Sequence, residues 1–125
     1  MKKIIKTDKA PEAIGPYSQA VEVGNMLFCS GQIPLDPLTG KLVDGGVDAQ
    51  AEQVFKNVKG LLESAGYSLN DVIKATVFAR SMNDFAVVNE IYGKYISKDF
   101  PARSFIEVSG LPKGALVEIE VVAAK

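Results

Sequence analysis

Arg103 stands where the chain could present a guanidinium group to an anion. Pro101 fixes its own backbone and disfavours a helical residue before it, so a helix upstream should end here. From Arg103 onwards the pattern predicts a strand with Arg103 and Phe105 on one face and Ser104 on the other. A guanidinium fixed beside a rigid turn can bind a carboxylate or a phosphate through paired hydrogen bonds. The alternative is an ordinary ion pair at the surface.

Two glutamates near the C-terminus form the second candidate. Glu118 and Glu120 alternate with apolar residues, which predicts a strand with both carboxylates on one face, about 6.6 Å apart. Such a pair could act in a glycosidase, but the chain has no tryptophan to form a sugar platform. The alternative is a strand face that is exposed to water. An antiparallel hairpin through residues 110–114 could bring Arg103 near the far end of this face.

Four further residues could complete a binding site. Ser30 and Gly31 end a predicted hairpin and offer a hydroxyl and an uncovered backbone N–H, which suit a carboxylate or an oxyanion. The alternative there is a plain tight turn. Tyr17 follows a Gly-Pro pair and could line a pocket or simply pack. Asn89 lies in a predicted helix, where a solvated side chain is the alternative.

The composition excludes several kinds of site and partner. The chain has no histidine and one cysteine, Cys29, which excludes a disulfide framework, a Cys/His metal site and nucleophilic pairs with His. No glycine-rich nucleotide-binding motif is present. The net charge of −1 and the scattered Lys and Arg residues argue against nucleic-acid and anionic-lipid partners. No stretch is apolar enough for a membrane span or a signal peptide, so we expect a cytoplasmic protein.

The elements that position these residues follow from hydrophobic periodicity. A length of 125 residues suits one domain over residues 1–125. The pattern predicts a short edge strand over 3–7, a hairpin over 17–30, a helix from an Asp48 N-cap to Gly66, a buried strand over 71–79, a helix from a Ser81–Asp84 capping box to about Lys98, and strands from Arg103 and over 116–124. Two helices can cover only one face of such a sheet, which predicts a two-layer α+β fold.

The second face of that sheet must then lie open. Several of the predicted strands carry apolar or aromatic residues towards it. Because an open apolar face on a small domain usually marks a partner, we expect a homo-oligomer with ligand sites between its subunits. The long Pro- and Gly-rich loop over 31–46 is also more typical of a functional or interface segment than of an idle one.

Seven ordered blocks resemble one family over essentially the whole chain. The blocks are Ile14-Gly15-Pro16-Tyr17-Ser18-Gln19, Ser30-Gly31-Gln32-Ile33-Pro34, Asn57-Val58-Lys59, Ala75-Thr76-Val77-Phe78, Phe85-Ala86-Val87-Val88-Asn89, Phe100-Pro101-Ala102-Arg103-Ser104, and Leu111-Pro112-Lys113-Gly114 followed by Val117-Glu118-Ile119-Glu120. Together they are similar to the RidA (YjgF) family of reactive-intermediate deaminases. The resemblance implies a chorismate-mutase-like fold in a homotrimer, with a central barrel of sheets and three clefts between subunits.

The resemblance also implies an activity and a set of roles. The reaction would be hydrolysis of enamines and imines such as 2-aminoacrylate and 2-aminocrotonate to 2-oxo acids and ammonia, without a cofactor. Arg103 matches the arginine that clamps the substrate carboxylate, with the Gly31 amide as a second donor. Glu118 matches the acid that positions and activates water. The residues that match positions lining the cleft are Tyr17, Ser30 and Asn89.

One residue departs from the family pattern, and two other functions stay open. Phe105 stands where many relatives carry a cysteine, so it changes the volume of the cleft and removes a hydrogen-bonding thiol.

A non-catalytic trimer that binds small 2-oxo or amino acids would also keep Arg103, although it would not need Glu118. An RNA-directed role as a translation inhibitor or ribonuclease, described for some relatives, conflicts with the absence of a basic stripe.

Overall fold

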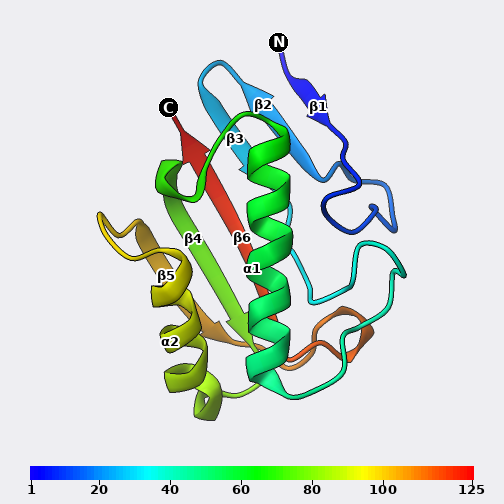
Figure 1. Cartoon of the computed structure of the whole chain (residues 1–125), viewed down its shortest axis with the longest axis vertical. Coiled ribbons are helices and arrows are strands. Elements are labelled where there is room, and N and C mark those ends of the chain that lie inside the picture. Colours follow the sequence, from blue (N-terminus) through cyan, green and yellow to red (C-terminus); the bar gives the residue numbers. More distant parts are fainter.

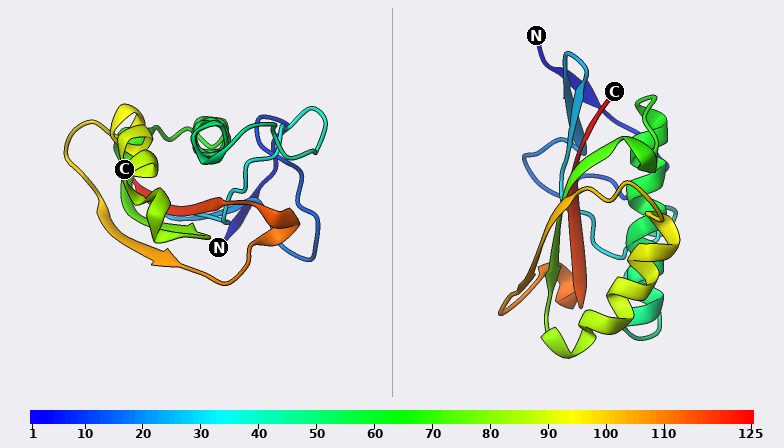
Figure 2. Two further views of the ribbon diagram at one scale, coloured as in Figure 1. Left: turned by 90° about the horizontal axis from the view of Figure 1, so that it is seen from below. Right: turned by 90° about the vertical axis from the view of Figure 1, so that its left-hand side faces the viewer.

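Six strands form one mixed sheet in the order β1-β2-β3-β6-β4-β5 (Figure 1). This computed structural model describes residues 1–125. The strands are β1 (Lys3–Ile5), β2 (Ala20–Val23), β3 (Met26–Cys29), β4 (Val72–Ala79), β5 (Ala102–Glu107) and β6 (Val117–Ala124). The helices are α1 (Val47–Ser64) and α2 (Phe85–Tyr95), with short 3₁₀ turns at Leu69–Asp71, Met82–Asp84 and Pro112–Gly114. Both α-helices lie on the same side of the sheet (Figure 2), which confirms the predicted two-layer α+β fold.

Helix α1 ends where its glycine predicted but begins earlier than expected. Gly66 has a φ of 84°, and the N–H of Tyr67 donates to the carbonyl of Leu62 at 2.9 Å, as in a Schellman motif. The prediction that Asp48 caps the helix is wrong, because Gly46 is the N-cap residue and Asp48 lies inside the first turn. Its charge there favours the helix through the dipole, without a capping hydrogen bond.

Helix α2 is shorter than predicted at both ends. The Ser81 hydroxyl accepts a hydrogen bond from the N–H of Asn83 at 3.1 Å, two residues on, within a 3₁₀ turn. The predicted capping box with Asp84 is therefore not formed, and the α-helix begins only at Phe85. It ends at Tyr95, before the predicted end at Lys98.

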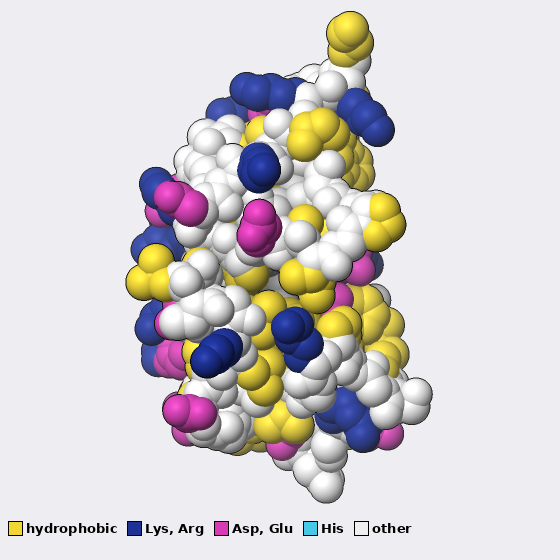
Figure 3. All heavy atoms as spheres, turned by 90° about the vertical axis from the view of Figure 1, so that its right-hand side faces the viewer, with side chains coloured by type: hydrophobic (Ala, Val, Ile, Leu, Met, Phe, Trp, Pro, Cys, Tyr) yellow, Lys and Arg dark blue, Asp and Glu magenta, His cyan; other side chains and the backbone are white.

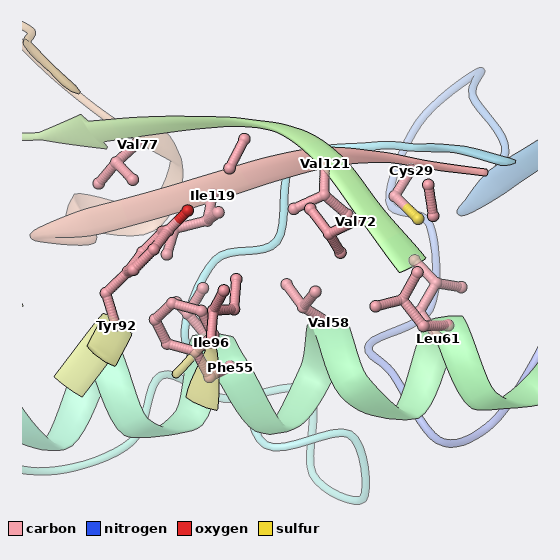
Figure 4. Close-up of a cluster of buried hydrophobic side chains, with 14 of the residues drawn as sticks. Cys29, Phe55, Val58, Leu61, Val72, Val77, Tyr92, Ile96, Ile119 and Val121 are labelled. Carbon is pink, nitrogen blue, oxygen red and sulfur yellow. The ribbon is translucent and has the colours of Figure 1, made fainter. Parts of the chain in front are cut away.

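The core lies between helix α1 and the helix-facing side of the sheet (Figure 4). Phe55, Val58 and Leu61 on α1 are at most 1% exposed and belong to one buried cluster with Val72 on β4 and with Ile119 and Val121 on β6. Burial of each such side chain contributes about 1.5–3 kcal/mol relative to exposure, so this layer dominates the stability of the domain.

Strand β4 separates β5 from β6, which corrects the expected hairpin. Strand β5 pairs in parallel with β4 after the α2 crossover, and β6 pairs antiparallel with the other edge of β4. The intervening segment crosses the end of β4, where Val108 N–H donates to the Ala79 carbonyl and Arg80 N–H donates to the Leu116 carbonyl. The loop over 110–114 is therefore a crossing connection and not a two-strand turn.

Two buried amides on helix α1 fix the segments that lead into β6 and away from β3. The Gln50 Oε1 atom accepts from the Leu116 N–H at 2.8 Å. The Asn57 Nδ2 atom donates to the carbonyls of Ile33 and Leu35 at 3.2 and 2.9 Å. Each amide satisfies loop backbone groups that a buried apolar side chain would leave unpaired.

The face of the sheet that is turned away from the helices is open and apolar. Ile4, Val23, Phe28 and Ile106 point to it and are 43–52% exposed. The predicted open apolar face is therefore confirmed, while the oligomer that would cover it stays a prediction.

Candidate functional site

Arg103 lies near the start of β5 and points towards helix α2. Its Nη1 atom donates to the Asn89 Oδ1 atom at 2.7 Å. No carboxylate of the chain pairs with it, since the one ion pair joins Lys94 and Glu52. A guanidinium has five N–H donors, so most of them remain available to an anion.

Aromatic rings surround the Arg103 guanidinium. Its Cζ atom lies 4.7 Å from the centroid of Tyr92, 5.6 Å from that of Phe105 and 5.9 Å from that of Phe85. Phe85 and Phe105 meet edge to face at 4.7 Å. A hollow of about 360 Å³ opens beside the guanidinium and is also lined by Asn89. Phe105 therefore lies near the guanidinium on the strand face that the alternation predicted, while its effect on the volume of the cleft stays a prediction.

Glu118 lies in a different hollow, of about 400 Å³, which Tyr17, Ser30 and Gly31 also line. Strand β6 carries Glu118, and the backbone of Ile119 exchanges two hydrogen bonds with the segment that follows Gly31. This pairing brings the carboxylate so close to Gly31 that a Cβ atom there would overlap its Oε2 atom. A side chain at position 31 would therefore displace the Glu118 carboxylate.

The polar groups around Glu118 are partly engaged. The Ser30 hydroxyl donates to the Ser18 carbonyl at 2.6 Å, so its oxygen is left as an acceptor. The Tyr17 hydroxyl accepts from the Ile14 N–H at 3.3 Å, and the Tyr17 side chain is 49% exposed. The Gly31 N–H donates to no atom of the chain, so it is free to bind an anion.

Burial raises the pKa of Glu118, and the negative charge of neighbouring Glu120 raises it further. Both effects favour the protonated acid, which can exchange a proton nearer to neutral pH than an ordinary glutamate can.

Cys29 is buried in the core, and burial raises the pKa of its thiol to about 12. A thiol with such a pKa is not a nucleophile at neutral pH, which agrees with the core role that its position predicts.

Arg103 and Glu118 lie on opposite faces of the same sheet. Arg103 pairs with Ala75 on β4, whereas Glu118 pairs with Phe78, three residues further along the same strand. Side chains alternate along a strand, so residues an odd number apart point to opposite faces. Arg103 therefore joins the helix side, and Glu118 joins the open side. The predicted hairpin that could bring Arg103 near the Glu118 face of the same chain is therefore not formed.

Comparison with known proteins places this chain in a family. The family model described as endoribonuclease L-PSP matches residues 7–125. The chain belongs to this family, also known as RidA. A RutC family protein from Pyrococcus horikoshii is 56% identical over 100% of this chain and 99% of the relative. The human protein named 2-iminobutanoate/2-iminopropanoate deaminase is 50% identical over 98% of this chain and 90% of its own. The crystal structure of RidA from the Antarctic bacterium Psychrobacter sp. PAMC 21119 has a TM-score of 0.95 and 50% identity, over 98% of this chain and 99% of that one.

Within this RidA-family chain, sequence reasoning missed the contact between Tyr92 and Arg103. The apolar spacing of Phe85, Val88, Tyr92 and Tyr95 places Tyr92 only on the buried face of its helix. Its spacing of three from Asn89 was the available signal, because residues three apart share one side of a helix.

No group of three or more Asp, Glu or Cys side chains is placed to hold a metal ion. Neither α-helix combines the length and the hydrophobicity that crossing a membrane requires.

Proposed function

We propose that this RidA-family protein hydrolyses small 2-imino acids to 2-oxo acids and ammonia. The observation that carries the proposal is the combination of an arginine without a protein carboxylate and a half-buried glutamate with a raised pKa. A half-identical relative that is named a 2-iminobutanoate/2-iminopropanoate deaminase supports the same substrate class. The first group suits the carboxylate of the substrate, and the second suits proton transfer at its C=N bond.

The proposed chemistry needs two functions from the protein. Arg103 and the free Gly31 N–H bind the carboxylate and orient the imine. Glu118 takes a proton from water as the water oxygen attacks the imine carbon, and it passes this proton to the nitrogen, which gives a carbinolamine. The carbinolamine hydroxyl then loses its proton as the C=O bond forms, and this second proton reaches the nitrogen through Glu118. The C–N bond breaks, and the products are a 2-oxo acid and ammonia. Tyr17, Ser30 and Asn89 line the cleft in this scheme.

We infer that two copies of the chain share each site. A small imino acid cannot reach both faces of one sheet, so the Arg103 side of one subunit has to meet the Glu118 side of another. The open apolar face gives such subunits a surface to bury against each other. A closed homotrimer, with a central barrel of sheets and three equivalent sites, satisfies both conditions.

Loss of imine is the direct test of activity. 2-Aminoacrylate or 2-aminocrotonate is generated in situ by a dehydratase, and its decay is followed with and without the protein. We expect the wild type to accelerate decay and Glu118→Ala to lose that acceleration, since general acid-base catalysis supplies about 10²–10⁴-fold. Binding of 2-oxobutyrate without any acceleration would instead support the non-catalytic sensor.

Mixing two inactive variants tests the shared site. Arg103→Ala and Glu118→Ala are combined, dissociated together and reassembled. If each site takes its arginine and its glutamate from different chains, about a quarter of the sites in a random equal mixture regain both residues. If one chain supplied both, no site would recover, and the shared site would be refuted.

The family description as an endoribonuclease raises a second candidate, which the surface does not favour. The side of the molecule shown in Figure 3 carries Lys and Arg side chains interspersed with Asp and Glu, without a continuous basic stripe. The net charge of −1 agrees with this distribution. We therefore expect no binding of single-stranded RNA at low salt, and binding that weakens steeply as salt is added would restore this function.

A further inference from the structure

Tyr92 and Asn89 approach Arg103 from the same side of helix α2. They are three residues apart, so α2 presents an amide oxygen and an aromatic ring side by side. The amide oxygen accepts a hydrogen bond from Nη1 at 2.7 Å. The ring lies under the guanidinium, with 4.7 Å between its centroid and Cζ. One contact is a directed hydrogen bond, and the other places the face of an aromatic ring against the guanidinium carbon.

The core holds the Tyr92 ring in turn. Tyr92 is 5% exposed and meets the fully buried Phe55 edge to face, with 5.6 Å between centroids and an angle of 84°. Figure 4 shows the side chain reaching from α2 towards the sheet, with its hydroxyl near Ile119. A ring packed in this way cannot easily change rotamer, so it is a rigid support for the group above it.

The hydroxyl of Tyr92 plays no part in the contact with Arg103. It is buried and has no hydrogen-bond partner. Burial raises the pKa of Tyr92 while the nearby Arg103 opposes that rise, so the phenol stays neutral at physiological pH. The contact with Arg103 is therefore made by the face of a neutral ring.

We propose that Tyr92 is a positioning residue whose ring holds the Arg103 guanidinium ready to bind the carboxylate of the substrate. The carboxylate role of Arg103 rests on the proposed function, but the restraint on the guanidinium does not. Asn89 fixes one nitrogen, the Tyr92 ring fixes the plane, and the remaining N–H groups stay free for the ligand.

A purely structural role for Tyr92 is the rival explanation, and Tyr95 supplies the matched control. Tyr95 lies one turn further along α2 and stacks on the same Phe55 ring, at 5.0 Å and 8°. Its hydroxyl donates to Glu52, and it makes no contact with Arg103 of the kind that Tyr92 makes. Tyr95→Leu therefore loosens the same aromatic cluster without removing the support under the guanidinium.

The experiment compares Tyr92→Phe, Tyr92→Leu and Tyr95→Leu with the wild type. Nitrogen NMR of the free protein measures rotation of the Arg103 guanidinium about its Cζ–N bonds. Titration with 2-oxobutyrate measures carboxylate binding, and imine decay gives KM and kcat separately. Thermal unfolding reports how far each variant is destabilised. The NMR readout needs neither ligand nor activity, so it can fail or succeed independently of the deaminase assignment.

We expect Tyr92→Phe to behave as the wild type in every binding readout, because it keeps the ring and removes an unpartnered hydroxyl. Tyr92→Leu should free the guanidinium to rotate, weaken 2-oxobutyrate binding and raise KM about tenfold, with a smaller change in kcat. Tyr95→Leu should lower the melting temperature without any of these effects. Slow guanidinium rotation in Tyr92→Leu, or equal rises in KM for Tyr92→Leu and Tyr95→Leu, would overturn the proposal.

Discussion

The Arg103 side and the Glu118 side of the sheet prepare their charged groups in different ways. Arg103 is placed by side chains, since Asn89 and Tyr92 on one helix contact its guanidinium. Glu118 is placed by backbone pairing, since the bridge between Gln32 and Ile119 sets its side chain in the space that a Cβ atom at position 31 would fill. The first arrangement depends on two side chains of one helix. The second depends on the absence of one side chain.

This difference shows how one small domain can hold half of a site on each face. The helix layer supplies the aromatic rings around Arg103 from within the chain and leaves a hollow beside the guanidinium. The environment of Glu118 opens onto the bare face, where the proposed shared site would bring a second copy of the chain. Catalytic assembly and subunit assembly then become one event.

Removal of the arginine should cause the largest loss. Arg103→Ala is expected to lower kcat/KM about a thousandfold, because the substrate carboxylate loses its charged partner. Arg103→Lys keeps the charge without the planar fork and should lose about a hundredfold. Steady-state rates of imine decay check both values, and circular dichroism checks that the fold is kept. Full activity in Arg103→Ala would remove this side of the sheet from the mechanism.

Filling the space beside the glutamate should have an intermediate effect. Gly31→Ala places a Cβ atom where the Glu118 Oε2 atom lies, so the carboxylate must move. We expect kcat to fall about thirtyfold, since displacement of a catalytic group by about 1 Å can cost 10²-fold. Gly110→Ala is the matched control, because a Cβ atom there meets nothing within 4 Å. Equal activity in the two variants would show that Glu118 tolerates displacement.

The smallest effect concerns the dependence of stability on pH. The pKa of Glu118 is raised in the folded chain, so above the ordinary carboxyl pKa the folded state retains a proton that the unfolded state has released. Wild-type stability should therefore fall as the pH rises from about 4 towards the raised pKa. Glu118→Gln lacks this loss, and its advantage in melting temperature should widen over that range.

The pH series has its own control on the same strand. Glu120→Gln removes the neighbouring charge that adds to the raised pKa of Glu118. When Glu118→Gln is compared with its parent in a Glu120→Gln background, its advantage in melting temperature should still widen with pH, but by less. Burial of Glu118 is the larger cause of the raised pKa and is unchanged in that background. A constant difference in melting temperature from pH 4 to pH 8 would contradict the assignment of a raised pKa.

Local signals in the sequence predicted the elements, the two-layer fold and the open face. The helical spacing of Val54, Phe55, Val58, Leu61 and Leu62 gave α1, and alternation gave the two faces of β5. These signals depend on residues within one element, so they can be recognised without knowledge of the fold. The family resemblance added the candidate residues, and their catalytic and binding roles stay predictions.

Partners that are distant in sequence could not be predicted in this way. The strand order is decided by the α2 crossover, which sets β5 parallel to β4 and away from β6. The false hairpin followed from assuming that consecutive strands are neighbours, which is a frequent but not general rule. The buried amides of Gln50 and Asn57 were missed for the same reason, because their loop partners lie 22–66 residues away.

The central place of β6 has a consequence during synthesis. Strand β6 follows all other strands in the sequence, yet it lies between β3 and β4. A nascent chain that ends before Val117 therefore holds two unconnected sheet fragments, β1-β2-β3 and β4-β5, with no strand to join them. The core on α1 cannot close until β6 has left the ribosome, so the domain must complete its folding after translation of that strand. Until then its apolar surface is open to chaperones.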